Sequence, residues 1–135
     1  MIVVCGYNQA VYEKLSRQSF GLVKVCALVH NMDELMAASD CMITKPGGLS
    51  ISEALVNGLP LIFFNAIPGQ ETHNIQVLKR YGIGKSGCTI AEMAGRLQEL
   101  KSSPELLCEA RQNAQRLARP GSVKEILSLI QRKLT

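Results

Sequence analysis

The chain has 135 residues, 47% of them hydrophobic and 19% charged, which fits one small packed domain. No apolar run approaches the roughly 18 residues of a membrane span. The start "MIVVCGYNQ" has neither the basic flank nor the long apolar run of a signal peptide. The net charge of +4 is mild, so it suits an anionic ligand or membrane surface without indicating a nucleic-acid partner.

Short apolar runs alternate with helical patterns along the whole chain. Strands are predicted at residues 2–5, 23–29, 41–44, 61–64 and 83–85. Helices are predicted at residues 8–16, 31–39, 49–57, 70–81, 89–100, 104–118 and 123–134. This order predicts an α/β fold with a Rossmann-like parallel sheet and helices on both of its faces.

Helix boundaries are marked by local signals. The stretches "NMDE", "TIAE" and "SVKE" have the spacing of capping boxes, with Asn31 as the first N-cap. Pro104 is placed in a first helical turn, and "NGLP" combines Gly58 after a helix C-cap with Pro60 beyond it.

The five cysteines are odd in number and widely spaced, without any C-x-x-C pair. They are expected to be reduced, mostly buried thiols of a cytoplasmic protein. They stand at positions 5, 26, 41, 88 and 108.

Two Gly-rich turns, at residues 45–50 and 68–71, follow predicted strands and open predicted helices. In parallel sheets, ligands bind beyond the carboxyl ends of the strands, and both turns fall on that edge. In the first turn, "TKPGGLSISEA", Gly47 and Gly48 allow a close backbone approach, and the helix start attracts a phosphate. Lys45 adds positive charge, and Glu53, one turn on, can accept hydrogen bonds from a ribose diol.

The second turn, "NAIPGQETHN", places an amide and two further polar groups at a helix start. Gln70, Glu71 and Asn74 can hold several hydroxyls, which suits a sugar better than a phosphate.

Both turns also have a plainer interpretation. The first could be a tight connection with Ser50 as a cap and Glu53 solvated, and the second could be ordinary N-terminal capping. Together, a phosphate turn and a hydroxyl turn on one edge suggest a nucleotide sugar.

The segment "CMITKPGGLSISEALVNGLPLIFFNAIPGQETHN" closely resembles the C-terminal domain of family 28 glycosyltransferases. Within that family it is most similar to monogalactosyldiacylglycerol synthases and bacterial processive diacylglycerol glucosyltransferases. The likeness runs from about Ile2 to the C-terminus, and it is weak after Gly87. It implies the C-terminal half of a glycosyltransferase B fold, which binds a UDP-sugar in a cleft facing an acceptor domain.

The resemblance also implies roles for individual residues. The loop at Leu28, Val29 and His30 would line the uracil through backbone groups. Glu53 would take the ribose hydroxyls. The diphosphate would face Gly47, Gly48, Leu49 and Ser50. The sugar would contact Gln70 and Glu71, with Asn74 in support.

The resemblance further implies an inverting transfer of a hexosyl group to a lipid such as diacylglycerol. No metal or other cofactor is expected, and no residue of this chain is assigned a catalytic role. The protein is expected in the cytoplasm, with peripheral contact at the inner face of the cell membrane. Two alternatives stay open: a non-catalytic module that binds UDP-sugars or docks a partner, and a fragment of a UDP-sugar epimerase.

Residues 1–135 are expected to form a partial donor-binding domain that lacks the first βα unit of the family. The acceptor lipid would then bind a separate N-terminal domain or a partner chain. The missing strand would lie inside the sheet, so its loss would leave two unpaired inner edges. Either the sheet closes up or another chain supplies the strand. The isolated chain is expected to self-associate or to be only marginally stable.

Overall fold

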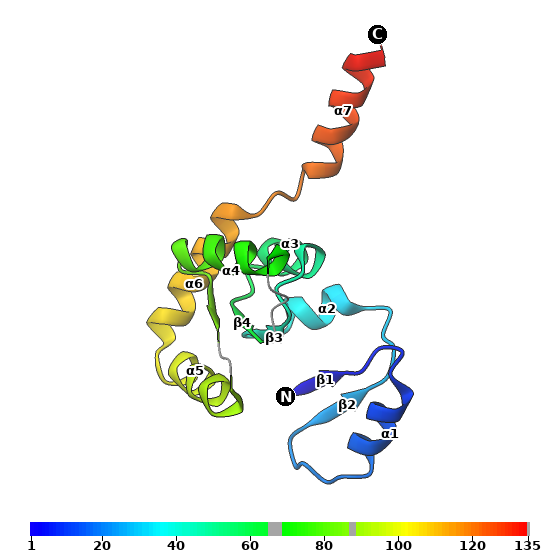
Figure 1. Cartoon of the computed structure of the whole chain (residues 1–135), viewed down its shortest axis with the longest axis vertical. Helices are drawn as coiled ribbons and strands as arrows, with labels where there is room; N and C mark the ends of the chain where they lie inside the picture. The colour runs from blue at the N-terminus through cyan, green and yellow to red at the C-terminus, as the bar shows by residue number, and fades with distance from the viewer. Residues whose placement is uncertain (65–68, 87–88, 135) are drawn as a thin grey trace. The chain divides into compact units, whose positions relative to one another are not determined.

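The computed structural model describes residues 1–64, 69–86 and 89–134. The chain divides into two compact units, residues 1–35 and 36–135, and each has its own parallel sheet (Figure 1). Within the described part, no helix combines the length and the apolar character needed to cross a bilayer.

The first unit is a βαβ motif. Strands β1 (Ile2–Val4) and β2 (Lys24–Cys26) pair in parallel, and helix α1 (Gln9–Ser16) connects them and contacts β2. The side chain of Asn8 caps α1, because its Oδ1 accepts a hydrogen bond of 3.1 Å from the backbone N–H of Val11. Strand β2 is shorter than the expected 23–29. Helix α2 (Met32–Ala37) follows at the boundary between the units.

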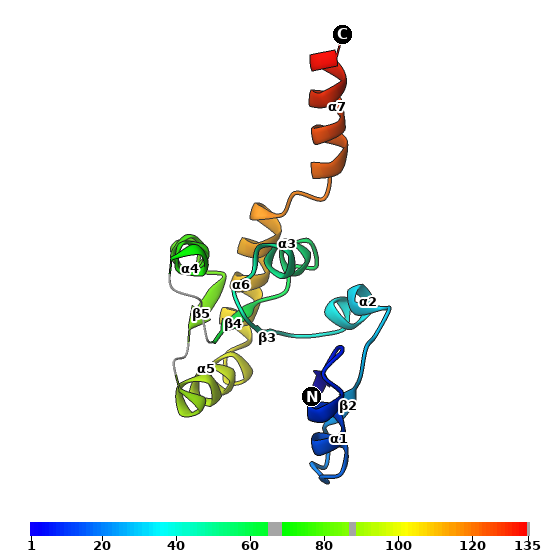
Figure 2. The ribbon, with the colours of Figure 1, turned by 45° about the vertical axis from the view of Figure 1, so that its right-hand side comes forward.

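The second unit holds a three-stranded parallel sheet in the order β3-β4-β5. In Figure 2 its strands lie between α3 and α4 on one side and α5 on the other. Helix α4 packs against β5, α5 against β4, and α6 against both α3 and α5. The strands are β3 (Met42–Thr44), β4 (Leu61–Phe63) and β5 (Gly84–Ser86), and the helices are α3 (Gly48–Val56), α4 (Gln70–Arg80), α5 (Ile90–Ser102), α6 (Pro104–Leu117) and α7 (Ser122–Leu134).

The core of the second unit is centred on β4. Leu61, Ile62 and Phe63 are each at most 1% exposed, because β4 has a strand on both sides and helices on both faces. Such a strand has no polar face, which explains the uninterrupted apolar run in the sequence.

The five strands pair as two parallel sheets. All five expected strands are present and parallel, yet within the described residues β1 pairs only with β2, and β3 pairs only with β4. Periodicity identifies strands from local pattern, whereas pairing depends on contacts between distant segments.

Two helices of the second unit end in the same motif. After α3, the N–H of Leu59 bonds the Ala54 carbonyl at 2.8 Å, and the N–H of Gly58 bonds the Leu55 carbonyl at 3.0 Å. Gly58 has a φ of +60°, which a residue with a side chain adopts at a cost. This is a Schellman motif, and it confirms the predicted stop in "NGLP". Helix α4 ends in the same way at Gly82.

The predicted helix starts are confirmed in part. Thr89 and Glu92 form a full capping box at α5, and Pro104 opens α6. Asn31 precedes α2, and its Nδ2 donates to the Glu34 carboxylate at 2.9 Å. The capping box predicted in "SVKE" is wrong. Its N-cap would be Ser122, which would have to precede the helix, whereas α7 begins at Ser122 itself.

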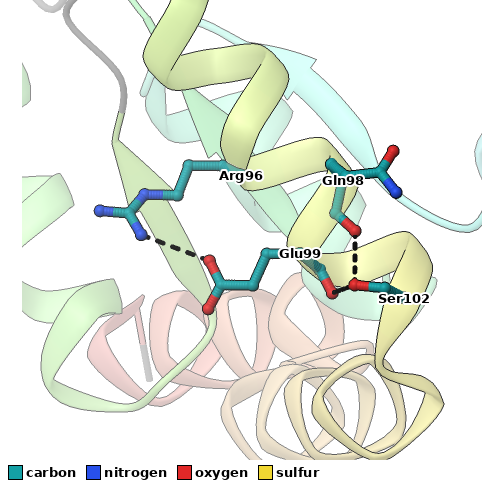
Figure 3. Close-up of polar contacts among 4 residues, drawn as sticks. All are labelled: Arg96, Gln98, Glu99 and Ser102. Carbon is teal, nitrogen blue, oxygen red and sulfur yellow. Dashed lines mark hydrogen bonds and ion pairs between the residues drawn. The ribbon is translucent and has the colours of Figure 1, made fainter.

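The last turn of α5 carries further local bonds, drawn in Figure 3. The Ser102 hydroxyl donates to the carbonyls of Gln98 and Glu99 at 2.8 and 3.2 Å, and the Glu99 carbonyl is one of the four that the helix end leaves open. Arg96 and Glu99 form an ion pair of 3.3 Å on the partly exposed surface. Solvent-screened pairs of this kind contribute at most about 1 kcal/mol to stability.

The thiols are less buried than expected. Cys5, Cys26 and Cys41 are half-buried, Cys108 is exposed, and Cys88 lies outside the described residues. Burial raises the pKa of the Cys41 thiol, and the neighbouring Asp40 carboxylate raises it further. Cys41 therefore holds less of the reactive thiolate at neutral pH than a solvated thiol does.

Alkylation at pH 7.5 should modify Cys108 first and Cys41 at least about ten times more slowly, because Cys41 is less accessible and holds its proton more tightly. Mass spectrometry after timed exposure to iodoacetamide measures the two rates. The Cys41 rate should climb as pH rises toward its raised pKa. Equal rates for the two residues would contradict this assignment.

Candidate functional site

The first candidate turn leaves β3 at Thr44 and enters α3 at Gly48. Gly47 is the N-cap in an extended conformation, and the N–H of Ile51 bonds its carbonyl at 3.0 Å. No side chain caps this helix. The alternative in which Ser50 is the cap is therefore wrong, because Ser50 lies inside the first turn of α3.

An uncapped helix start leaves backbone donors open. The first N–H groups of a helix have no intrahelical acceptor, which here applies to Gly48, Leu49 and Ser50. These N–H groups lie at the positive end of the helix dipole. A Cβ built on Gly47 or Gly48 meets no atom within 4 Å, and Leu49 is 84% exposed. The turn is thus open to a ligand as large as a phosphate group.

Two charged residues accompany this turn. Lys45 is exposed directly after β3, and Glu53 is exposed on α3. The backbone carbonyl of Glu53 accepts from Asn57 Nδ2 at 2.9 Å. Among the described residues, no hydrogen bond or ion pair engages the Glu53 carboxylate. That carboxylate can accept hydrogen bonds from a bound diol.

The second candidate turn leads into α4. Gly69 is the N-cap with a φ of +91°, again without a side-chain cap, and Gln70 is the first residue of the helix. Glu71 is half-buried in the first helical turn. Pro68, the first residue of the expected turn, lies outside the described residues. The positive φ accounts for a glycine at the N-cap position, where polar side chains are otherwise common.

The two turns are joined by one hydrogen bond that the sequence did not reveal. Asn74 Nδ2, on the second turn of α4, donates to the Pro46 carbonyl at 2.9 Å, and the pair is partly buried. The bond spans 28 residues of sequence. It brings the start of α4 to the β3–α3 turn, so Asn74 acts as a tie between the turns. Pro46 itself is buried, which anchors the acceptor side of this bond.

Val29 is placed in the first unit, between β2 and α2. It is half-buried, and its neighbours Leu28 and His30 are exposed. The other candidate residues all belong to the second unit, and the Asn74 bond brings their two turns together. Within the described ranges, no three His, Cys, Asp or Glu side chains gather closely enough to hold a metal ion.

Comparison with known proteins places this chain in a family. Residues 1–80 match the family model described as the glycosyltransferase family 28 C-terminal domain. The chain belongs to this family. A processive diacylglycerol beta-glucosyltransferase of Staphylococcus carnosus is 34% identical over 119 residues, covering 87% of this chain and 30% of that protein. One of the same name from Bacillus mycoides is 31% identical over 133 residues, covering 96% and 34%.

The fold comparison agrees with the family 28 assignment. The crystal structure of Acinetobacter baumannii MurG matches with a TM-score of 0.76 over 98% of this chain and 41% of that one. At 20% identity the likeness shows the fold, which is the expected Rossmann-like half of a glycosyltransferase B protein. This family 28 chain spans about a third of the length of the curated relatives it matches.

Proposed function

We propose that this chain is the donor-binding part of an inverting glycosyltransferase that moves a hexosyl group from a UDP-sugar to a lipid such as diacylglycerol. The observation that carries the proposal is the start of α3 at the glycine pair, which has no side-chain cap and is linked through the Asn74 hydrogen bond to the start of α4. The family 28 match and the names of the curated relatives support the same reaction.

The diphosphate belongs at the α3 turn. Three backbone N–H groups and the helix dipole there favour an anion, and exposed Lys45 adds a cation. The same groups would stabilise UDP as it departs, because charge builds on the leaving oxygen in the transition state. In this proposal no metal ion is needed for that stabilisation.

The hydroxyl-bearing parts of the donor belong to the two flanking groups. Glu53 would accept hydrogen bonds from the ribose, and the Val29 loop would line the uracil. Gln70 and Glu71 would hold the hexose. Since Asn74 already donates to Pro46, its role in this proposal is to set the position of α4 against the phosphate turn.

In the reaction, a hydroxyl of the acceptor lipid attacks the sugar C1 and displaces UDP from the opposite face, which inverts the anomeric centre. The acceptor loses a proton to a general base, and the diphosphate leaves with the bonding electron pair. We place the base and the lipid site in a second domain or a partner chain. The chain described here would hold and activate the donor.

Replacing Gly48 with alanine separates the role in binding from any role in folding. The added methyl group meets no protein atom, so the melting temperature should be kept or raised, since alanine is the better helix former. UDP affinity should fall at least about tenfold, because the methyl group would stand between backbone and phosphate.

Gly95→Ala is the matched control, since Gly95 lies within α5 with open space around it. This variant should leave UDP affinity unchanged. Calorimetry with UDP and thermal melts of the two variants measure both effects. If Gly48→Ala binds UDP as tightly as wild type does, the diphosphate does not bind at this turn.

A further inference from the structure

Every backbone carbonyl from residue 44 to residue 47, where β3 turns into α3, accepts a hydrogen bond from within the protein. Three of the donors are backbone N–H groups, and the donor to Pro46 is the side chain of Asn74 at 2.9 Å. The backbone bonds run from Phe64 to Thr44 at 3.2 Å, from Gly47 to Lys45 at 2.9 Å and from Ile51 to Gly47 at 3.0 Å. With these acceptors occupied, the turn offers a ligand the open N–H groups at the start of α3.

The peptide group between Pro46 and Gly47 is held at both of its ends. Its N–H bonds the Lys45 carbonyl across a three-residue turn, and its carbonyl accepts from Asn74. The first bond acts within the turn, so the second alone of these two fixes the peptide group relative to α4. The residue types leave its orientation open, because proline followed by glycine suits turns of type I and type II, which differ in this peptide group.

We propose that Asn74 is a positioning residue for the diphosphate and not a ligand of the sugar. The inference rests on the proposed donor-binding function. The Asn74 amide keeps the Pro46 carbonyl directed at α4, so that the turn presents only N–H groups to an anion. Donors that are fixed before an anion arrives bind it more tightly than donors that must be ordered during binding.

The chemistry of the acceptor fixes which way the Asn74 side chain faces. A carbonyl oxygen can only accept, so the Nδ2 end of the amide has to meet Pro46. An aspartate at position 74 has nearly the same shape, but its ionised carboxylate has no donor and would face the carbonyl with two acceptors. A protonated aspartate regains one O–H donor. The proposed role therefore predicts an effect of pH on Asn74→Asp.

The test measures UDP affinity of the full chain by calorimetry, with Asn74→Asp set against Gln76→Glu. Both variants exchange an amide for a carboxylate on α4, and Gln76 is exposed. At pH 7.5, Asn74→Asp should bind UDP at least about tenfold more weakly than Gln76→Glu does. At about pH 5 the gap should narrow, because the bond to Pro46 favours the protonated aspartate. Wild type at each pH accounts for the titration of UDP itself.

Asn74→Ala gives a second readout that does not depend on ionisation. It should weaken UDP binding about fivefold, while binding of uridine, which lacks the phosphates, should change less than about twofold. A general loosening of the fold would weaken both compounds alike. Equal losses for UDP and uridine would overturn the proposal, and so would equal UDP affinities of Asn74→Asp and Gln76→Glu at pH 7.5.

The Gly48→Ala variant separates this proposal from that of the donor site. If Gly48→Ala loses UDP affinity while both Asn74 variants keep it, the diphosphate binds at the turn and only the role of Asn74 is wrong. If wild type binds no UDP, both proposals are wrong.

Discussion

Replacing Glu53 with alanine should lower the affinity of the chain for UDP by about ten- to a hundredfold. A hydrogen bond to a charged group contributes about 1.5–3 kcal/mol when its partner is held in place. Glu53 is exposed on the helix that begins at the phosphate turn, so its removal takes away acceptors without opening a cavity. The fold should therefore be unaffected.

Calorimetry measures the loss, with Glu109→Ala as the control. Glu109 is an exposed carboxylate on α6, beside a small cavity of about 190 Å³ at the Pro60 and Gly82 end of the strands, opposite the candidate turns. The ribose role has its own check in 2′,3′-dideoxy-UDP, which should bind wild type as weakly as UDP binds Glu53→Ala. If the dideoxy compound binds wild type as tightly as UDP does, Glu53 does not hold the ribose.

The largest loss of stability is expected from Ile62→Ala. Ile62 is fully buried in the central strand β4, and truncation of such a residue costs about 2–5 kcal/mol through lost transfer energy and the cavity left behind. Urea unfolding followed by circular dichroism measures the change in the free energy of unfolding.

Ile43→Ala is the matched comparison. Ile43 is the register partner of Ile62 on β3, yet it is 40% exposed. Its truncation should cost less than about 2 kcal/mol, because less surface is removed from a packed environment. Similar losses at both positions would mean that β3 is covered in solution by something outside the described chain.

Local chemistry made the element order predictable. Some signals depend only on residues a few positions apart, so they can be recognised in the sequence. They are the apolar β-branched runs, the Thr89–Glu92 capping box and the glycine at position 58. The capping box at Ser122 failed for an equally local reason. A backbone bond of 3.1 Å from the N–H of Glu125 to the Gly121 carbonyl starts α7 one residue earlier.

Long-range contacts were the part that the sequence could not supply. Strand periodicity does not show which strands pair, so the two-stranded and three-stranded sheets were expected only through the inner strand that the family resemblance says is missing. The Asn74 bond to Pro46 is a similar case. An asparagine in the second turn of a polar helix resembles a ligand contact, and only the fold reveals a tie to a carbonyl 28 residues away.

The central claim is that the β3–α3 turn holds the diphosphate of a UDP-sugar, and amide chemical shifts of the ¹⁵N-labelled chain test it directly. Titration with UDP should move the backbone N–H signals of Gly48, Leu49 and Ser50 most, because these groups would donate to the phosphates. Uridine without phosphate should leave them nearly unmoved. If UDP produces no shifts, or if its largest shifts fall away from this turn, the account is contradicted.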